Sequence, residues 1–176
     1  MDPTQYVLLI RSKPNAVVVL CCDAVNPRGT LIKTVRNYIG GNPILLAVTR
    51  CDLLPDYVKQ DWSLERQEQV KQFFKQQAKE LNPAEVYLCS VDENDEEEIF
   101  DGAQQLSSDL LQHLNGRDTY VIGAANIGKS TLTDRIINNI IKIQQPKAPS
   151  TRAKTEKEKK KRRFMKASED RKDQLL

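Results

Sequence analysis

The sequence predicts an α/β fold built on a mostly parallel sheet, and three observations support this prediction. Apolar runs rich in β-branched residues recur along the 176-residue chain, they alternate with segments of helical periodicity, and one of them leads into a glycine-rich loop. These runs are continuously apolar, which is typical of strands covered by helices on both faces. Crossovers between parallel strands are right-handed, and ligands bind beyond the carboxyl ends of the strands.

Four segments are expected as strands. Each is a short apolar run that ends near a polar residue, a glycine or a proline. They cover residues 16–22, 44–48, 85–90 and 119–122.

Helices are expected between and after these strands. Residues 26–29, Asn-Pro-Arg-Gly, form a turn, and helical spacing then predicts helices over 31–39, 63–81 and 99–114, and from the glycine-rich loop to just before Pro146. The apolar face of the second helix is predicted to contain Leu64, Val70, Phe73, Phe74, Ala78 and Leu81. The apolar face of the last helix is predicted to contain Leu132, Ile136, Ile137, Ile140 and Ile141.

Charge is distributed unevenly along the chain. Residues 147–176 hold 12 Lys/Arg and 5 Asp/Glu, a charge of +7, whereas the remaining 15 basic and 19 acidic residues give −4. We therefore expect one domain over residues 1–145 and a basic tail over 146–176, disordered or helical. No apolar run approaches the roughly 20 residues that span a bilayer, so no membrane partner is expected.

The cysteines and the histidine are expected to be structural. Cys21, Cys22, Cys51 and Cys89 lack metal-site spacing and lie in or beside apolar runs, which predicts buried free thiols. His113 near a helix end is expected as a surface residue rather than a catalytic base. The acidic residues 92–98 are expected as a solvated helix start rather than an ion site.

The pattern Gly, four residues, Gly-Lys-Ser at residues 123–130 predicts a phosphate-binding loop between a strand and a helix. Glycines allow the backbone to bring successive N–H groups onto phosphate oxygens, and the helix N-terminus adds its positive dipole. Lys129 would neutralise the β- and γ-phosphates, and Ser130 would coordinate Mg²⁺. The predicted phosphate contacts are Gly123, Ala124, Asn126, Ile127, Gly128, Lys129, Ser130 and Thr131.

Two shorter motifs predict that the base is guanine. Thr49-Arg50-Cys51-Asp52 follows a strand in the manner of Asn/Thr-Lys-x-Asp, whose carboxylate accepts the two guanine donors that adenine lacks. Arg50 replaces the lysine, and a guanidinium can stack on a ring. Ser90-Val91 resembles the Ser-Ala element whose backbone N–H reaches guanine O6. Thr49, Arg50, Asp52, Ser90 and Val91 are therefore the predicted guanine contacts.

The order of these motifs, base before phosphate, resembles the circularly permuted GTPases. Residues 41–55 together with 120–132 are most similar to the YqeH and nitric oxide-associated branch of that group, and residues 23–30 also resemble other permuted GTPases. The resemblance covers about residues 5–142. It implies a circularly permuted Ras-like G domain of the P-loop NTPase fold, binding of GTP or GDP with Mg²⁺, GTP hydrolysis, and a role in small ribosomal subunit assembly.

The sequence departs from that branch in several places. It contains neither the zinc finger, nor Asp-x-x-Gly, nor the C-terminal RNA-binding domain that the resemblance implies, and Thr151 is the candidate for the switch threonine at Mg²⁺. We therefore expect a truncated gene model or a fragment, with a G domain incomplete at its C-terminal half. The strand at 119–122 would then lie at a sheet edge, and no catalytic residue is identified.

Three functions are compatible with these motifs. The first is a guanine nucleotide-binding protein of ribosome assembly, in a mitochondrion or plastid if the source is a eukaryote and otherwise cytoplasmic, with no targeting signal in this chain. The second is an RNA-binding or scaffold module with a vestigial nucleotide site, in which the basic tail contacts the phosphates of ribosomal RNA or the small subunit. For the tail itself, a solvated extension is slightly favoured over an RNA contact. The third, an ATP-using kinase, is disfavoured by Asp52. The oligomeric state stays open.

Overall fold

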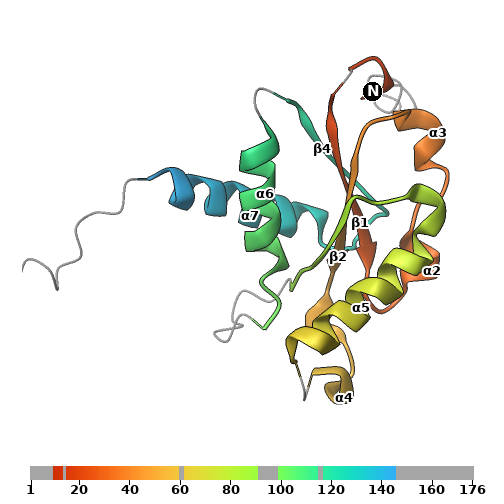
Figure 1. Ribbon diagram of the computed structural model, residues 1–176, viewed down its shortest axis with the longest axis vertical. Helices are drawn as coiled ribbons and strands as arrows, with labels where there is room; N and C mark the ends of the chain where they lie inside the picture. The colour runs from red at the N-terminus through yellow and green to blue at the C-terminus, as the bar shows by residue number, and fades with distance from the viewer. Residues whose placement is uncertain (1–9, 14, 60–61, 91–98, 115–116, 146–176) are drawn as a thin grey trace, which may run out of the picture. The chain divides into compact units, whose positions relative to one another are not determined.

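The computed structural model describes residues 10–13, 15–59, 62–90, 99–114 and 117–145 (Figure 1). The chain divides into a compact unit over residues 1–142 and a second unit over 143–176. Only residues 143–145 of the second unit are described, so the predicted boundary at residue 145 stays a prediction. Within the described residues, no helix is both long and apolar enough to cross a membrane.

The four predicted strands are confirmed, and in the described residues they form one parallel sheet of order β3-β2-β1-β4. The central pair is linked in register from Val18 opposite Ile44 to Asp23 opposite Thr49. The strands are β1 (Val17–Asp23), β2 (Ile44–Thr49), β3 (Glu85–Leu88) and β4 (Thr119–Ile122). Because all four run the same way, their carboxyl ends meet at one edge of the sheet.

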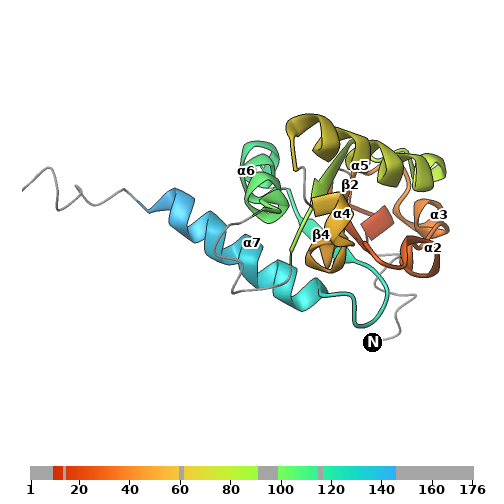
Figure 2. The ribbon, with the colours of Figure 1, turned by 90° about the horizontal axis from the view of Figure 1, so that it is seen from below.

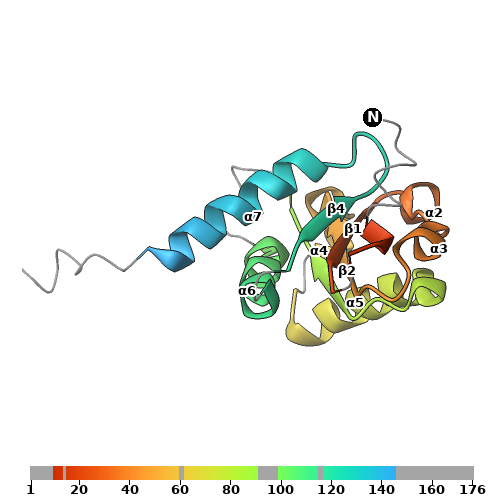
Figure 3. The ribbon, with the colours of Figure 1, turned by 90° about the horizontal axis from the view of Figure 1, so that it is seen from above.

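The sheet has an apolar core on each face. In β1 every residue is buried, and successive side chains alternate between the two cores. Val18, Leu20 and Cys22 pack with apolar residues of the helices α3 (Val35–Ile39) and α5 (Leu64–Gln77). Val17, Val19 and Cys21 pack with residues of α6 (Gly102–Leu114) and α7 (Lys129–Gln144). Figures 2 and 3 show these two helix pairs on opposite sides of the sheet. Burial on both faces explains why the strands are continuously apolar.

The helices of the described residues lie between and after the strands. They are α2 (Pro27–Thr30), α3 (Val35–Ile39), α4 (Asp56–Lys59), α5 (Leu64–Gln77), α6 (Gly102–Leu114) and α7 (Lys129–Gln144), with short 3₁₀ turns η1 (Cys51–Leu53) and η2 (Lys79–Leu81).

The prediction of a helix over residues 31–39 is wrong for the first half of that range. The predicted turn at 26–29 instead starts helix α2, because the Asn26 side chain accepts the Gly29 N–H at 3.0 Å and Pro27 occupies the first helical position. Leu31 then adopts an extended conformation, and the next helix begins only at Val35.

Two of the predicted apolar helix faces are too wide. In α5, Phe74 is buried, as is Ala78 just after the helix, whereas Leu64 and Phe73 are 83% and 50% exposed. At 3.6 residues per turn, Phe73 points about 100° away from Phe74. On α7, Leu132 and Ile136 are buried, whereas Ile137 and Ile141 are about half exposed. Each helix contacts the sheet through a narrower stripe than its apolar residues suggest.

Gly102 allows α6 to begin directly against β3. A Cβ atom at this position would lie 2.3 Å from the Leu88 carbonyl oxygen and 2.6 Å from the Leu88 carbonyl carbon. These are backbone atoms of the strand, which cannot rotate away as a side chain would. Close contact between α6 and β3 therefore requires glycine here.

The prediction that β4 lies at an edge is confirmed within the described residues, where it pairs only with β1. Its four residues are half-buried, unlike those of β1. The expected buried free thiols are also confirmed for Cys21, Cys22, Cys51 and Cys89.

Candidate nucleotide-binding site

The glycine-rich loop joins β4 to α7, as the motif requires. Asn126 and Gly128 have positive φ angles of 58° and 83°, which turn the backbone between the strand and the helix. A Cβ atom at Gly123 would lie 2.9 Å from the Cys21 carbonyl oxygen and 2.9 Å from Ile127 Cδ1, so the loop passes close to β1. Ile127 is buried in the core beneath the loop and anchors it.

Lys129 and Ser130 are the first residues of α7, at the positive end of the helix dipole. The Lys129 ammonium bonds to the Ala124 carbonyl oxygen, so the side chain folds back over the loop. Ser130 is exposed. Thr131 is half-buried one residue later. An ammonium over a turned loop, with an exposed hydroxyl beside it, fits a phosphate chain with a bound cation.

Thr49 is buried completely, and its hydroxyl lies between two backbone carbonyls. The Thr49 oxygen is 2.6 Å from the Ile127 carbonyl oxygen and 3.1 Å from the Cys22 carbonyl oxygen. Thr49 therefore links the end of β2 to the phosphate loop. Its hydroxyl contacts the protein backbone, while the guanine contact expected from the sequence stays a prediction.

Asp52 and Ser90 come together at the carboxyl ends of β2 and β3. The Ser90 hydroxyl donates to Asp52 Oδ1 at 3.3 Å, and the Cys51 N–H donates to the Cys89 carbonyl at 3.1 Å. Asp52 lies in the 3₁₀ turn η1, which places its carboxylate at this edge beside Ser90. A carboxylate held in this way can accept a pair of N–H donors from a planar ring.

Arg50 takes a left-handed backbone conformation, with φ 62° and ψ 33°. Its Nη1 donates to Asp23 Oδ2 at 2.8 Å, and the two side chains form an ion pair at the end of β1. The Arg50 side chain remains 37% exposed, whereas that of Asp23 is 7% exposed.

Sequence reasoning missed several residues that hold this edge together. Asp23 pairs with Arg50, Lys59 donates to the Asp52 carbonyl at 3.1 Å, and Arg135 of α7 donates to the Ser90 carbonyl at 3.0 Å. Arg135 and Ser90 are 45 residues apart, so no local pattern could reveal the contact. Val91, Thr151, the acidic residues 92–98 and the His113 side chain lie outside the described residues.

The strand order places the two motifs on either side of β1. The chain proceeds from β1 through β2 to β3 on one side and returns to β4 on the other. A ligand crevice is expected where the order reverses, at the carboxyl ends of β1 and β4. Strands lie about 4.8 Å apart, so the phosphate loop and Asp52 follow strands separated by about 10 Å. A nucleotide spans a comparable distance between its phosphates and its base.

The residues present fit Mg²⁺ bound through a nucleotide. No cluster of three or more His, Cys, Asp or Glu side chains that could hold a metal occurs in the part of the chain that the structure describes. Mg²⁺ commonly keeps waters and binds substrate phosphates with few protein ligands. The exposed Ser130 at the start of α7 is the side chain that would join it.

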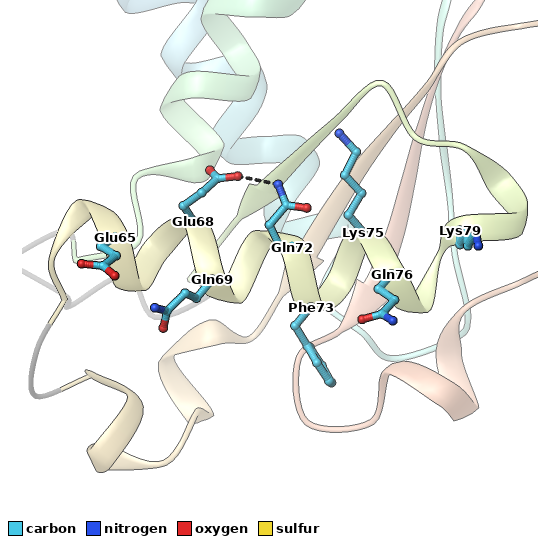
Figure 4. Close-up of a pocket in the computed structure, with 8 residues that line it drawn as sticks. All are labelled: Glu65, Glu68, Gln69, Gln72, Phe73, Lys75, Gln76 and Lys79. Atoms are coloured by element: carbon cyan, nitrogen blue, oxygen red, sulfur yellow. Dashed lines mark hydrogen bonds between the residues drawn. The ribbon is translucent and has the colours of Figure 1, made fainter.

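An open hollow of about 870 Å³ lies along the outer face of α5 (Figure 4). All of its lining residues come from α5 and the η2 turn, between Glu65 and Lys79. Glu68 and Gln72 bond to one another at 2.7 Å along the helix. A single helix and the turn after it supply this surface, whereas groups from several elements meet at the carboxyl ends of the strands. The hollow along α5 therefore lacks the convergent polar groups that are typical of a ligand site.

Comparisons with known proteins identify several relatives of similar sequence. The chain is 33% identical over 128 residues to "Uncharacterized protein YqeH" of Bacillus subtilis (strain 168). It is 32% identical over 138 residues to "NO-associated protein 1, chloroplastic/mitochondrial" of Arabidopsis thaliana. These alignments cover 72% and 76% of this chain. No protein-family model matches the chain.

Both names coincide with the branch that the sequence motifs resemble, which supports that resemblance. The matched regions make up 31% of the Bacillus protein and 21% of the Arabidopsis protein. The chain thus spans between a fifth and a third of the length of these relatives, and it is similar to one part of each.

Proposed function

We propose that this chain binds guanine nucleotides, GTP and GDP, together with Mg²⁺. The observation that carries the proposal is the meeting of a phosphate loop and an Asp52–Ser90 pair at one edge of a parallel sheet, linked through Thr49. The loop supplies backbone donors and Lys129 for the phosphates. Asp52 supplies two acceptor oxygens for the guanine N1–H and N2–H₂ groups, which adenine does not offer.

The residues divide by role along the edge of the sheet. Residues 123–129 would surround the phosphates, and Ser130 would coordinate Mg²⁺ when the nucleotide is bound. Arg50 and Ser90 would frame the base around Asp52, with Val91 beyond the described residues. Mg²⁺ supplies positive charge that favours binding of the triphosphate. We assign no residue as a catalyst of hydrolysis.

The motif order and the relatives support a more specific proposal. The base motif precedes the phosphate loop in the chain, yet the strand order places β1 between them, as in a circularly permuted G domain. We propose that the chain comes from a GTPase of the YqeH and nitric oxide-associated branch, acting in bacterial-type or organellar small ribosomal subunit assembly. The Arabidopsis relative's name, which includes "chloroplastic/mitochondrial", supports an organellar location if the source is a eukaryote.

Nucleotide exchange tests the binding proposal directly. The purified chain is titrated with fluorescent GDP and then challenged with unlabelled GTP, GDP or ATP in the presence of Mg²⁺. We expect GTP and GDP to displace the probe while ATP does not. Displacement by ATP at the same concentration as GTP would contradict the role of Asp52.

Lys129→Ala should weaken GDP binding. The substitution removes a charge-assisted contact to phosphate, worth roughly 1.5–3 kcal/mol, which corresponds to a rise in Kd of about tenfold or more. Lys142→Ala is the matched control, because Lys142 lies exposed in the last turn of the same helix. Equal GDP affinities for Lys129→Ala and Lys142→Ala would disprove the phosphate-loop assignment.

The charge distribution favours a second function, RNA binding. Residues 147–176 carry +7 and the remainder −4. Removing residues 147–176 should weaken RNA binding and flatten its dependence on salt, because fewer phosphate contacts release fewer counterions. Nucleotide affinity should stay nearly unchanged. If RNA binding and its salt slope persist in the shortened chain, the tail is not the RNA contact.

A further inference from the structure

The end of β1 holds a carboxylate, that of Asp23, to which the sequence motifs assign no role. Asp23 is the last residue of the strand, and its side chain is only 7% exposed. Its Oδ1 accepts the Val25 N–H at 2.9 Å, which fixes the carboxylate through a local turn. Its Oδ2 accepts Arg50 Nη1 at 2.8 Å. Both oxygens therefore have a defined role, one in the turn and one in the ion pair.

Arg50 is held in a conformation that few non-glycine residues adopt. Its φ of 62° lies in the left-handed region, where a side chain other than that of glycine is strained. The ion pair with Asp23 occupies Nη1, one nitrogen of a planar group with five N–H donors. More than a third of the side chain stays exposed, so a ligand can still contact Arg50.

The pair lies between the two halves of the candidate site. Asp23 is opposite Thr49 in the β1–β2 register, and the preceding Cys22 carbonyl shares the Thr49 hydroxyl with the phosphate loop. On its other side, β1 pairs with the strand that leads into the loop. The guanidinium is thus anchored on the strand that separates phosphate loop from base motif.

We propose that Asp23 is a positioning residue of the nucleotide site, which holds the Arg50 guanidinium where it covers the purine ring. The inference rests on the proposed guanine nucleotide binding. A free arginine side chain samples many rotamers, and a charge-assisted bond to a fixed carboxylate removes most of that freedom before the ligand arrives. Arg50 contacts the ring, and Asp23 acts only through Arg50.

The test compares two ligands in the full chain, GDP and inorganic pyrophosphate, by titration calorimetry. Pyrophosphate occupies the phosphate loop but has no base. Asp23→Asn keeps the acceptor for the Val25 N–H and removes the charge that holds Arg50. We expect Asp23→Asn to raise the Kd for GDP roughly tenfold, the scale of one charge-assisted contact. The Kd for pyrophosphate should be unchanged. Asp23→Ser, whose hydroxyl can also accept the Val25 N–H, carries the same expectation.

A double variant shows whether Asp23 acts through Arg50. Arg50→Met removes the guanidinium, so adding Asp23→Asn to it should cause no further loss of GDP affinity. Asp118→Asn is the control, because it breaks an exposed ion pair with Lys13. Asp118 lies just before β4, at the amino ends of the strands and away from the candidate site. This control should bind both ligands as the unmodified chain does.

The possible failures are distinguishable. If the unmodified chain does not bind GDP, the proposed function and this inference both fall. If it binds GDP and Asp23→Asn binds equally well, only the inference falls. Equal losses of GDP and pyrophosphate affinity, or additive losses in the double variant, would assign Asp23 a general structural role and overturn its role at the base.

Discussion

At the scale of single residues, the Thr49 hydroxyl is the contact on which the geometry of the site depends. It is fully buried and lies within hydrogen-bonding distance of carbonyls from two other elements, Cys22 in β1 and Ile127 in the phosphate loop. A hydroxyl donates one proton, and the shorter distance of 2.6 Å favours Ile127. The Thr49 side chain therefore helps to fix the position of the loop relative to the base motif, together with the pairing of β1 with β2 and β4.

Thr49→Val tests this dependence. Valine matches threonine in shape but cannot donate, so the buried Ile127 carbonyl would lose its partner at a cost of about 1–3 kcal/mol. We expect the free energy of unfolding, measured with urea, to fall by this amount and GDP binding to weaken. Thr49→Ser retains the hydroxyl and should keep most of the nucleotide affinity. A valine variant as stable as the unmodified chain would show that the bond contributes little.

The sequence identifies the residues of the motifs but does not predict which residues they contact. Local patterns led to Gly123, Lys129, Asp52 and Ser90, because each motif is contiguous in the chain. The Asp23–Arg50 pair joins residues 27 positions apart, and the Thr49–Ile127 bond joins residues 78 positions apart. Such contacts depend on which strands become neighbours, and that is fixed only when the sheet assembles.

At the scale of elements, strands were easier to predict than helix faces. Continuous apolar runs such as β1 identify strands whose two faces are both buried. Helix α5 has apolar residues around more than one face, and spacing alone does not show that Phe74 packs on the sheet while Phe73 is exposed. Asn26 illustrates a second limit, since a side-chain cap converts an expected turn into the short helix α2.

Gly102→Ala tests how α6 begins. Alanine is favoured over glycine inside helices by about 1 kcal/mol. Here the added Cβ would lie 2.3 Å from a backbone oxygen of β3, and such overpacking costs roughly 1–3 kcal/mol or more. We expect a net loss of stability of up to about 2 kcal/mol in urea unfolding. Gly41→Ala is the control, because nothing lies within 4 Å of a Cβ atom there. Equal stabilities of the two variants would contradict the clash.

At the scale of the whole molecule, two apolar cores enclose the sheet and all four thiols. Burial raises the pKa of Cys21 and Cys22 to about 12, and it also raises the pKa of Cys51 and Cys89. The Lys129 ammonium partly opposes this effect at Cys21. The folded state therefore favours the protonated form of all four thiols.

This predicts a loss of stability at high pH. Below pH 9.0 these thiols are protonated in both states, and their contribution to stability is fully present. Between pH 9 and about pH 12 the unfolded chain releases protons that the folded chain keeps, so the free energy of unfolding falls. Each buried thiol adds up to about 1.4 kcal/mol per pH unit to this slope.

Urea unfolding at several values of pH in this window measures the slope. Cys22→Ala removes one titrating thiol and should give a shallower decline than the unmodified chain, whatever its stability at neutral pH. Other groups, tyrosine and lysine among them, titrate in both proteins and cancel in the comparison. Identical slopes would mean that the Cys22 thiol ionises as readily in the folded chain as in the unfolded chain.

The strand order also has a consequence for how the chain is made. A ribosome releases β1, β2 and β3 in that order, and together they form a complete run of neighbours on one side of β1. Of the four described strands, β4 leaves the ribosome last and pairs with the other side of β1. Until then, the most deeply buried strand of the sheet has one open margin of unpaired amide and carbonyl groups, the kind of surface on which nascent chains associate with one another or with chaperones. The segment that carries the glycine-rich loop is thus also the one that covers this margin of β1.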